Sequence, residues 1–418
     1  MKTPRILIIA GSDSGGGAGI QADIKTITML GGHAMTAITA VTAQNTQGVT
    51  AVHAVPTETV LAQIDAVVAD IGVDAVKIGM IGSPFTALHI AARLEALEGV
   101  PIVFDPVMVA TSGASLADDG TIAAFGKLMD AATLATPNMP ELKRLTGEDD
   151  EVSGAFKLVS RHGCAVLIKG GHEEGAALAD ALVEDDNITS WQGSRIDTTS
   201  THGTGCTLAS AIAFYLGAGL PLAQAVERGR LFVRMALHEA AGLGHGHGPL
   251  GQQNVRMDTG LGLRLNQVTV TGKDYAKMVA FYRKLGLKQI VDSEENLYAR
   301  FEAGATTFSI QCDPEAEIGD TVAVYFECDD LDERVEQLAR SGIPFEHGPR
   351  NQPWMWREAR LRDPSGNTIF LYKAGEARRF PPWRIDDSEL PEPAAPAPPS
   401  LEELRSGPTL SKKPRELS

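Results

Sequence analysis

The sequence predicts an α/β fold: a doubly wound, mostly parallel sheet, followed by an α+β domain and a disordered tail. Three observations lead to this prediction. Between residues 5 and 242, short β-branched apolar runs alternate with longer helical stretches. Between residues 265 and 373, the order of one strand, one helix and three strands occurs twice. Beyond residue 376 the chain is rich in proline and poor in large apolar residues, so it cannot bury enough surface to order itself.

At 418 residues the chain exceeds one typical domain. We expect a first domain over residues 1–252, a linker over 253–264, a second domain over 265–375 and the tail over 376–418. The glycine-rich stretch before the linker contains His245 and His247. Because no carboxylate or cysteine supports them, these two histidines do not predict a metal site.

Six runs predict the strands of the first sheet: RILIIAG, AMTAITAVTAQ, AVKIGM, PIVFDPVM, ATLATPN and CAVLIKGG. They are apolar on both faces, as parallel strands covered by helices on both sides are. In such sheets ligands bind beyond the carboxyl ends of the strands. Those ends carry residues 11–19, Gln44, residues 79–80, Asp105, Asn138 and Lys169. We therefore expect the site at this edge of the sheet.

The second domain is predicted as two βαβββ units. In the first unit LNQVTVTG is a strand, DYAKMVAFYRKLGL an amphipathic helix, and LKQIV, NLYARFEA and TTFSIQC are strands. In the second, TVAVYFEC is a strand and DDLDERVEQLARSGI a helix, and WREARLRD and NTIFLYK are strands joined by the turn DPSG.

Charge and cysteine content narrow the functional class. A net charge of -16 argues against non-specific binding to nucleic acid or to an anionic membrane, but a pocket in an acidic protein can still bind a nucleotide. The four cysteines form no CxxC pair, which indicates reduced thiols. The N-terminal apolar run is too short for a membrane span, so we expect a cytoplasmic protein.

The run GTGCT at residues 203–207 precedes the helix-like LASAIAFYLGAGL. Small residues there let backbone N–H groups at a helix N-terminus converge on an anion, and Cys206 is a candidate base beside it. A glycine-rich helix start is also common as plain turn chemistry. The glycine-rich segment at residues 10–26 lacks the GK[ST] of a Walker A loop, but its three successive glycines permit close backbone approach to a ligand.

Three strand ends carry candidate ligands for Mg²⁺ and phosphate. Asp105, Asn138 and Glu141 supply the oxygen ligands that Mg²⁺ prefers near phosphates. Lys169 could reach a β- or γ-phosphate. The alternative is that the polar groups are helix caps and that Lys169 is an exposed lysine without a role.

Eight segments resemble the hydroxymethylpyrimidine/phosphomethylpyrimidine kinases of thiamine biosynthesis, in the ribokinase-like superfamily. They are AGSDSGGGAGIQADIKT, TAVTAQNTQGV, VKIGMIGS, FDPVMVATSG, TPNMPEL, LIKGGH, THGTGCTLASAIA and GHGHGP, in this order over nearly all of residues 1–250. The resemblance implies a ribokinase-like fold, two successive phosphorylations, ATP as donor and Mg²⁺ as cofactor. It also implies a homo-oligomer.

The resemblance assigns roles by position. Gln44 matches the glutamine that binds the aminopyrimidine, Met80 packs on the ring, and Asp23 and Gly11 lie on the other side of that pocket. The Mg²⁺ and phosphate shell corresponds to Asp105, Glu141, Asn138 and Lys169, and the anion hole to Gly203, Thr204, Gly205 and Cys206.

Sugar kinases of the superfamily have Asp where this chain has Cys206. A thiol at a helix N-terminus is expected to have a lowered pKa and to take the proton of the hydroxymethyl group. The second phosphorylation needs no base, because its nucleophile is an already ionised phosphate oxygen.

The segments LNQVTVTGKDYAKMVAFYRKLGLK, YFECDDLDERVEQLARSGI and LRDPSGNTIFLY resemble the vicinal-oxygen-chelate superfamily, which includes glyoxalases, bleomycin-resistance proteins and dioxygenases. Its enzymes bind a divalent metal through His and Glu. Here Gln267, Ala323 and Phe370 stand at three ligand positions, so we expect a metal-free binding cup. Its candidate lining residues are Trp354, Trp356, Tyr298 and Phe308, although aromatic residues on strands also form cores.

Two other functions remain open for the first domain. One is a pyridoxal-type kinase of the same superfamily, and the other is a catalytically silent pyrimidine-binding regulator. The second domain serves either binding or oligomerisation.

Overall fold

The computed structural model describes residues 3–110, 113–114, 116–170, 177–185, 187–255, 267–304, 306–317, 323–328 and 331–374. The predicted tail and the predicted linker beyond residue 255 lie outside these ranges. The chain divides into two compact units, Met1–Arg264 and Leu265–Ser418.

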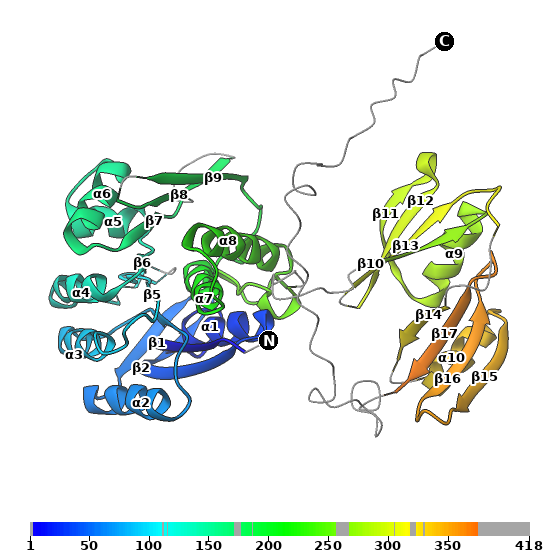
Figure 1. Ribbon diagram of the computed structural model, residues 1–418, viewed down its shortest axis with the longest axis horizontal. Helices are drawn as coiled ribbons and strands as arrows, with labels where there is room; N and C mark the ends of the chain where they lie inside the picture. The colour runs from blue at the N-terminus through cyan, green and yellow to red at the C-terminus, as the bar shows by residue number, and fades with distance from the viewer. Residues whose placement is uncertain are drawn as a thin grey trace, which may run out of the picture. The chain divides into compact units, whose positions relative to one another are not determined.

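The first unit is built on one sheet of nine strands, in the order β3-β2-β1-β4-β5-β6-β7-β8-β9 (Figure 1). The strands are β1 (Arg5–Asp13), β2 (His33–Asn45), β3 (Gly48–Ala54), β4 (Ala75–Ile78), β5 (Ile102–Phe104), β6 (Leu134–Ala135), β7 (Ala165–Ile168), β8 (Ala177–Val183) and β9 (Ile188–Ser194). The six predicted strands are β2, β1, β4, β5, β6 and β7, and all of them run parallel. Sequence analysis did not identify the antiparallel strands β3, β8 and β9.

Helices cover both faces of this sheet, which confirms the predicted doubly wound fold. They are α1 (Gly19–Leu30), α2 (Thr57–Asp70), α3 (Pro84–Leu94), α4 (Asp119–Ala131), α5 (Met139–Thr146), α6 (Glu151–His162), α7 (Thr204–Gly217) and α8 (Leu222–His238). Alternate residues of β1 enter two separate cores: Leu7 and Ile9 pack with α2, α3, α4 and α6, whereas Ile6 and Ile8 pack with α1, α7 and α8. This alternation follows from the period of two along a strand.

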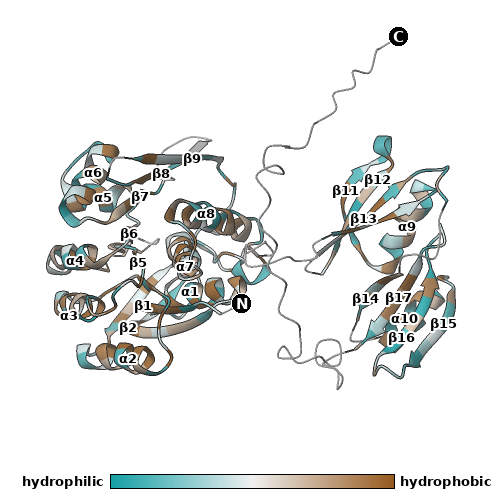
Figure 2. Cartoon of the chain, viewed as in Figure 1, coloured by the Kyte–Doolittle hydropathy of each residue, from teal (hydrophilic) through white to brown (hydrophobic). Residues whose placement is uncertain are grey.

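Helix α7 lies in the middle of its layer and contacts α1, α8 and the sheet. Every residue from Thr207 to Tyr215 is buried, and the helix is hydrophobic along most of its length (Figure 2). A helix that is apolar on all sides is stable only when it is enclosed. The enclosure fixes the N-terminus of α7 firmly at the carboxyl edge of the sheet.

The second unit contains the two predicted βαβββ modules. The first comprises β10 (Gln267–Gly272), α9 (Tyr275–Leu285), β11 (Lys288–Ser293), β12 (Tyr298–Ala303) and β13 (Thr306–Cys312). The second comprises β14 (Ala323–Glu327), α10 (Leu331–Arg340), β15 (Phe345–Asn351), β16 (Arg357–Arg362) and β17 (Thr368–Lys373). Strand β15 was not identified from the sequence. Their sheets have matching orders, β10-β13-β12-β11 and β14-β17-β16-β15, and the two modules share one hydrophobic core. Each helix in the described part of the chain is too short or too polar to span a bilayer.

Candidate active site

A cavity of about 1110 Å³ opens at the carboxyl edge of the large sheet. It lies beside β1, where the strand order reverses between β2 and β4. Nearly all of the predicted site residues line it: Gly11, Gln44, Met80, Asp105, Asn138, Glu141, Lys169, Gly203, Thr204, Gly205 and Cys206. Residues more than 190 positions apart in the sequence therefore meet in one cavity, as the strand-end prediction required.

The start of α7 is shaped by two glycines. Gly203 has φ +87, and a Cβ there would lie 1.9 Å from the carbonyl oxygen of Gly17, so this contact with the glycine-rich loop requires glycine. A Cβ on Gly205 would lie 3.3 Å from Asp105 Oδ2 and 3.5 Å from Lys169 Nζ. The helix N-terminus, with its positive potential, thus borders the acidic and basic groups of the site.

Lys169 and Asp105 form an ion pair of 2.8 Å at the cavity wall. Asp105 Oδ1 also accepts a hydrogen bond from Thr136 at 3.0 Å. Burial disfavours the charge of Lys169, but attraction to Asp105 and Glu141 outweighs this effect and raises the pKa of Lys169. Lys169 is therefore a cation at neutral pH, although it is largely shielded from solvent.

Asn138 and Glu141 form a capping box at the start of α5. The Asn138 side chain accepts from the Glu141 N–H at 2.9 Å, and Glu141 Oε2 accepts from the Asn138 N–H at 2.8 Å. The helix-cap interpretation of these residues is thus correct, yet both also line the cavity. Burial raises the pKa of Glu141, and Lys169 opposes this shift.

The carboxylates of Asp105 and Glu141 suit Mg²⁺, which is commonly held near phosphates by one or two carboxylates together with phosphate oxygens and water. Asp105 Oδ1 accepts a hydrogen bond from Lys169, and Glu141 Oε2 accepts one from the Asn138 N–H. Within the described ranges, no cluster of three or more His, Cys, Asp or Glu side chains could hold a metal alone. The donor set fits a metal that is shared with a phosphate-bearing substrate.

Two predictions need correction. The pKa of Cys206 is not lowered: burial raises it to about 11, despite the nearby charge of Lys77 and the helix N-terminus. Asp23 does not border the cavity. It is 0% exposed, pairs with Lys77 at 2.8 Å and accepts from Ser210 at 2.7 Å. Its helix turns it inward, toward β4 and α7, and away from the ligand space.

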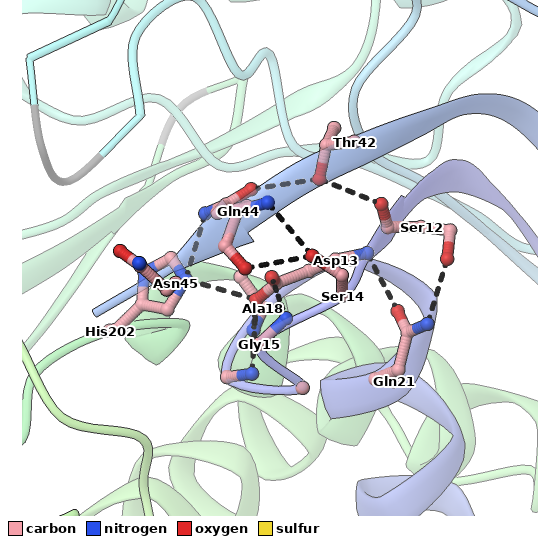
Figure 3. A network of polar contacts seen from close by, with 12 residues as sticks. Ser12, Asp13, Ser14, Gly15, Ala18, Gln21, Thr42, Gln44, Asn45 and His202 are labelled. Atoms are coloured by element: carbon pink, nitrogen blue, oxygen red, sulfur yellow. Dashed lines mark hydrogen bonds and ion pairs between the residues drawn. The ribbon is translucent and has the colours of Figure 1, made fainter. Parts of the chain in front are cut away.

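Gln44 and Met80 line the cavity near the glycine-rich loop. A Cβ on Gly11 would meet Met80 Sδ at 3.0 Å, so these two predicted residues are in contact. Gln44 belongs to a polar network with Asp13, His202 and Thr42 (Figure 3). Asp13 and His202 were not singled out from the sequence, although both stand inside motifs that were.

The HGHG segment joins two loops. The backbone N–H groups of His245 and His247 donate to Thr46, at its Oγ1 and its carbonyl oxygen, and His247 Nδ1 lies 3.2 Å from Thr201 Oγ1. The segment thereby ties the turn after β2 to the loop before α7.

In the second unit the four residues predicted to line a binding cup lie in different environments. Phe308 is 2% exposed and packs with Tyr282 and Phe326 in the core. Trp356 stacks on Tyr372 at 4.8 Å, and Trp354 is exposed. Tyr298 accepts from Arg300 Nε at 2.8 Å. At two of the positions that the resemblance gives as metal-ligand positions, Phe370 stacks on Tyr325 and Gln267 contacts Thr307.

Comparison with known proteins matches two parts of the chain to two families. Residues 13–251 match the family model described as phosphomethylpyrimidine kinase. Residues 264–371 match the Glyoxalase/Bleomycin resistance protein/Dioxygenase superfamily.

A hydroxymethylpyrimidine/phosphomethylpyrimidine kinase of Rhizobium meliloti is 46% identical over 58% of this chain and 95% of its own length. The thiamine biosynthesis bifunctional protein ThiED of Geobacter sulfurreducens is also 46% identical, over 59% of this chain, and the chain spans 51% of that relative's length. The pyridoxal kinase from Staphylococcus aureus, solved in complex with AMP-PCP and pyridoxal, is 28% identical with a TM-score of 0.56, covering 60% of this chain and 94% of its own. The chain therefore belongs to the phosphomethylpyrimidine kinase family.

Proposed function

We propose that the chain uses ATP to phosphorylate 4-amino-5-hydroxymethyl-2-methylpyrimidine and then its monophosphate, giving the diphosphate for thiamine biosynthesis. The observation that carries this proposal is that one cavity is lined both by Gln44 and Met80 and by Lys169, Asp105 and the start of α7. A ring bound at Gln44 and Met80 would share this cavity with a phosphate bound at Lys169 and the start of α7.

The groups around Lys169 are suited to phosphoryl transfer by positioning and charge neutralisation. Lys169 would contact the transferred phosphate, and the N–H groups of residues 203–206 would bind its oxygens. Asp105 and Glu141 would hold Mg²⁺, with Asn138 supporting Glu141. When bound, Mg²⁺ would neutralise part of the phosphate charge.

Cys206 would serve the two phosphorylations differently. In the first, the hydroxymethyl oxygen attacks the phosphate and loses its proton, and Cys206 would accept that proton. With a pKa near 11, the thiol is mostly protonated at neutral pH, so only a small thiolate fraction would act as base. In the second, the attacking phosphate oxygen is already ionised and needs no base.

The kinase activity would reside in residues 1–252, and residues 265–375 would form an accessory, metal-free domain. The protein would act in the cytoplasm as a homo-oligomer on small-molecule substrates, without nucleic-acid or membrane partners.

The test is a ³¹P NMR time course of the full chain with ATP, Mg²⁺ and either the hydroxymethylpyrimidine or pyridoxal. Successive monophosphate and diphosphate signals from the pyrimidine support the proposal. Turnover of pyridoxal alone would establish the pyridoxal-type alternative. Binding of the pyrimidine by calorimetry without turnover of either compound would indicate a silent regulator.

A further inference from the structure

Asp13 is a buried anchor at the end of β1. Its Oδ1 accepts from the Gly15 N–H at 2.8 Å, and its Oδ2 accepts from the N–H groups of Gly17 and Ala18 at 3.0 and 2.8 Å. The same Oδ2 lies 3.0 Å from His202 Nε2. Burial disfavours ionisation, but the hydrogen bonds from His202 and the backbone outweigh it and lower the pKa of Asp13.

The ionised carboxylate decides which group carries the proton. A carboxylate has acceptors only, so the contact between Asp13 and His202 is a hydrogen bond only if Nε2 of His202 carries the hydrogen. His202 is therefore a donor at Nε2. A second group close to this nitrogen must be an acceptor.

Gln44 is that second group. Its Nε2 lies 3.0 Å from His202 Nε2, so two N–H donors confront one another (Figure 3). At its other end, Oε1 lies 3.2 Å from Thr42 Oγ1, whose one hydrogen is already directed to the carbonyl oxygen of Ser12 at 3.0 Å. A half turn of the amide resolves both conflicts, because it exchanges oxygen and nitrogen while the rest of the side chain keeps its place. The single hydrogen on His202 Nε2 is then shared between Asp13 Oδ2 and Gln44 Oε1, which both lie 3.0 Å away.

We propose that Asp13 and His202 are positioning residues that fix the amide of Gln44 with Oε1 toward His202 and Nε2 toward Thr42, and that this orientation selects a ring bearing an amino group beside a ring nitrogen. The inference rests on the proposed pyrimidine kinase function. In this orientation Oε1 keeps one lone pair for the substrate amino group. Nε2 keeps one hydrogen for the ring nitrogen, giving a two-point match of the kind that glutamine makes with adenine.

The test compares two substrates with opposite hydrogen-bonding edges: the 4-amino pyrimidine and its 4-oxo analogue, which presents an acceptor beside an N–H. For the wild type we expect kcat/KM to favour the amino compound by about 100-fold, as one reversed two-point contact implies. His202→Phe frees the amide of Gln44 to turn, so the preference should fall to about tenfold or less, mainly through KM.

Two variants separate positioning from general damage. His202→Gln can restore a donor near the same place and should recover most of the preference. Gln21→Ala is the matched control, because Gln21 bonds Asp13 N and Ser12 Oγ in the same network without reaching Gln44. Its preference should stay at the wild-type value. An undiminished preference in His202→Phe, or an equal loss in Gln21→Ala, would overturn the proposal.

A second measurement does not depend on turnover. In the full chain labelled with ¹⁵N-histidine, the His202 Nε2 resonance should show a directly bonded proton at pH 8. An unprotonated Nε2 would overturn the positioning role even if the kinase is active. A protonated Nε2 in a protein that phosphorylates neither pyrimidine would support the positioning role of Asp13 and His202 and refute the kinase function.

Discussion

Lys77 and Asp23 form an ion pair of 2.8 Å in which both side chains are completely buried beneath the active site. Lys77 comes from β4 and Asp23 from α1, and Ser210 of α7 completes the set. Burial raises the pKa of Asp23 despite the attraction of Lys77. The pair therefore joins the sheet to the helix layer at a high desolvation cost.

Replacing Lys77 with Met should leave the Asp23 carboxylate buried without its counter-charge. We expect a loss of about 3 to 5 kcal/mol in the free energy of unfolding. Arg93→Met is the matched control, because Arg93 pairs with Asp65 at 3.2 Å on the surface and should cost less than about 1 kcal/mol. Urea unfolding of both variants measures the difference; equal losses would contradict this account.

Cys206→Ala should separate the two phosphorylations. If the thiolate accepts the hydroxymethyl proton, the first step should slow by about 100-fold or more, the usual contribution of a general base. The second step should slow much less. Quenched-flow kinetics with the pyrimidine and with its monophosphate gives both rates, and similar losses in the two steps would refute the base role.

The raised pKa of Cys206 also predicts a pH-dependent stability. The unfolded thiol ionises near its model value of 9.0, whereas the folded thiol holds its proton to about 11. Between these values the unfolded state binds fewer protons, so the free energy of unfolding falls as pH rises.

Cys206→Ala should remove the contribution of this thiol to the pH-dependent loss in the free energy of unfolding, which is on the order of 2 kcal/mol. Urea unfolding at pH 8 and pH 10.5 in reducing buffer measures it. Cys164→Ala should behave alike, since burial also raises the pKa of Cys164 to about 11. A wild type that gains stability over Cys206→Ala with rising pH would instead show a lowered pKa.

Truncation tests the independence of the two units. Gln252 Nε2 donates to Thr207 at 3.1 Å, and Val255 packs in the core formed with α1, α7 and α8. A chain ending at Val255 should keep the kinase kinetics per site, whereas one ending at Gly251 should lose about 2 kcal/mol of stability. ³¹P NMR rates and thermal unfolding test this. Slower turnover in the chain that ends at Val255 would indicate that the second unit contributes to the active site.

The parallel strands were predictable because strands buried on both faces are continuous apolar runs. Strand β9 alternates exposed and half-buried residues, and β15, with the sequence FEHGPRN, contains glycine and proline, so neither has such a signal. Nearly all of the site residues that were predicted from motifs at strand ends likewise line the cavity. The position of Asp23 was not predictable, because its partner Lys77 lies 54 residues away. The pKa of Cys206 depends on burial, which the helix N-terminus alone does not reveal.

Glu141 completes the capping box in the first turn of α5 and also lines the cavity, where we propose that it binds Mg²⁺. In a deep mutational scan this position should therefore tolerate fewer replacements than a cap or a ligand alone. Glutamine would preserve the cap but remove the negative charge, and aspartate would preserve the charge but shorten the reach. The requirement for a stable fold and the requirement for turnover therefore both restrict which residue can stand at position 141.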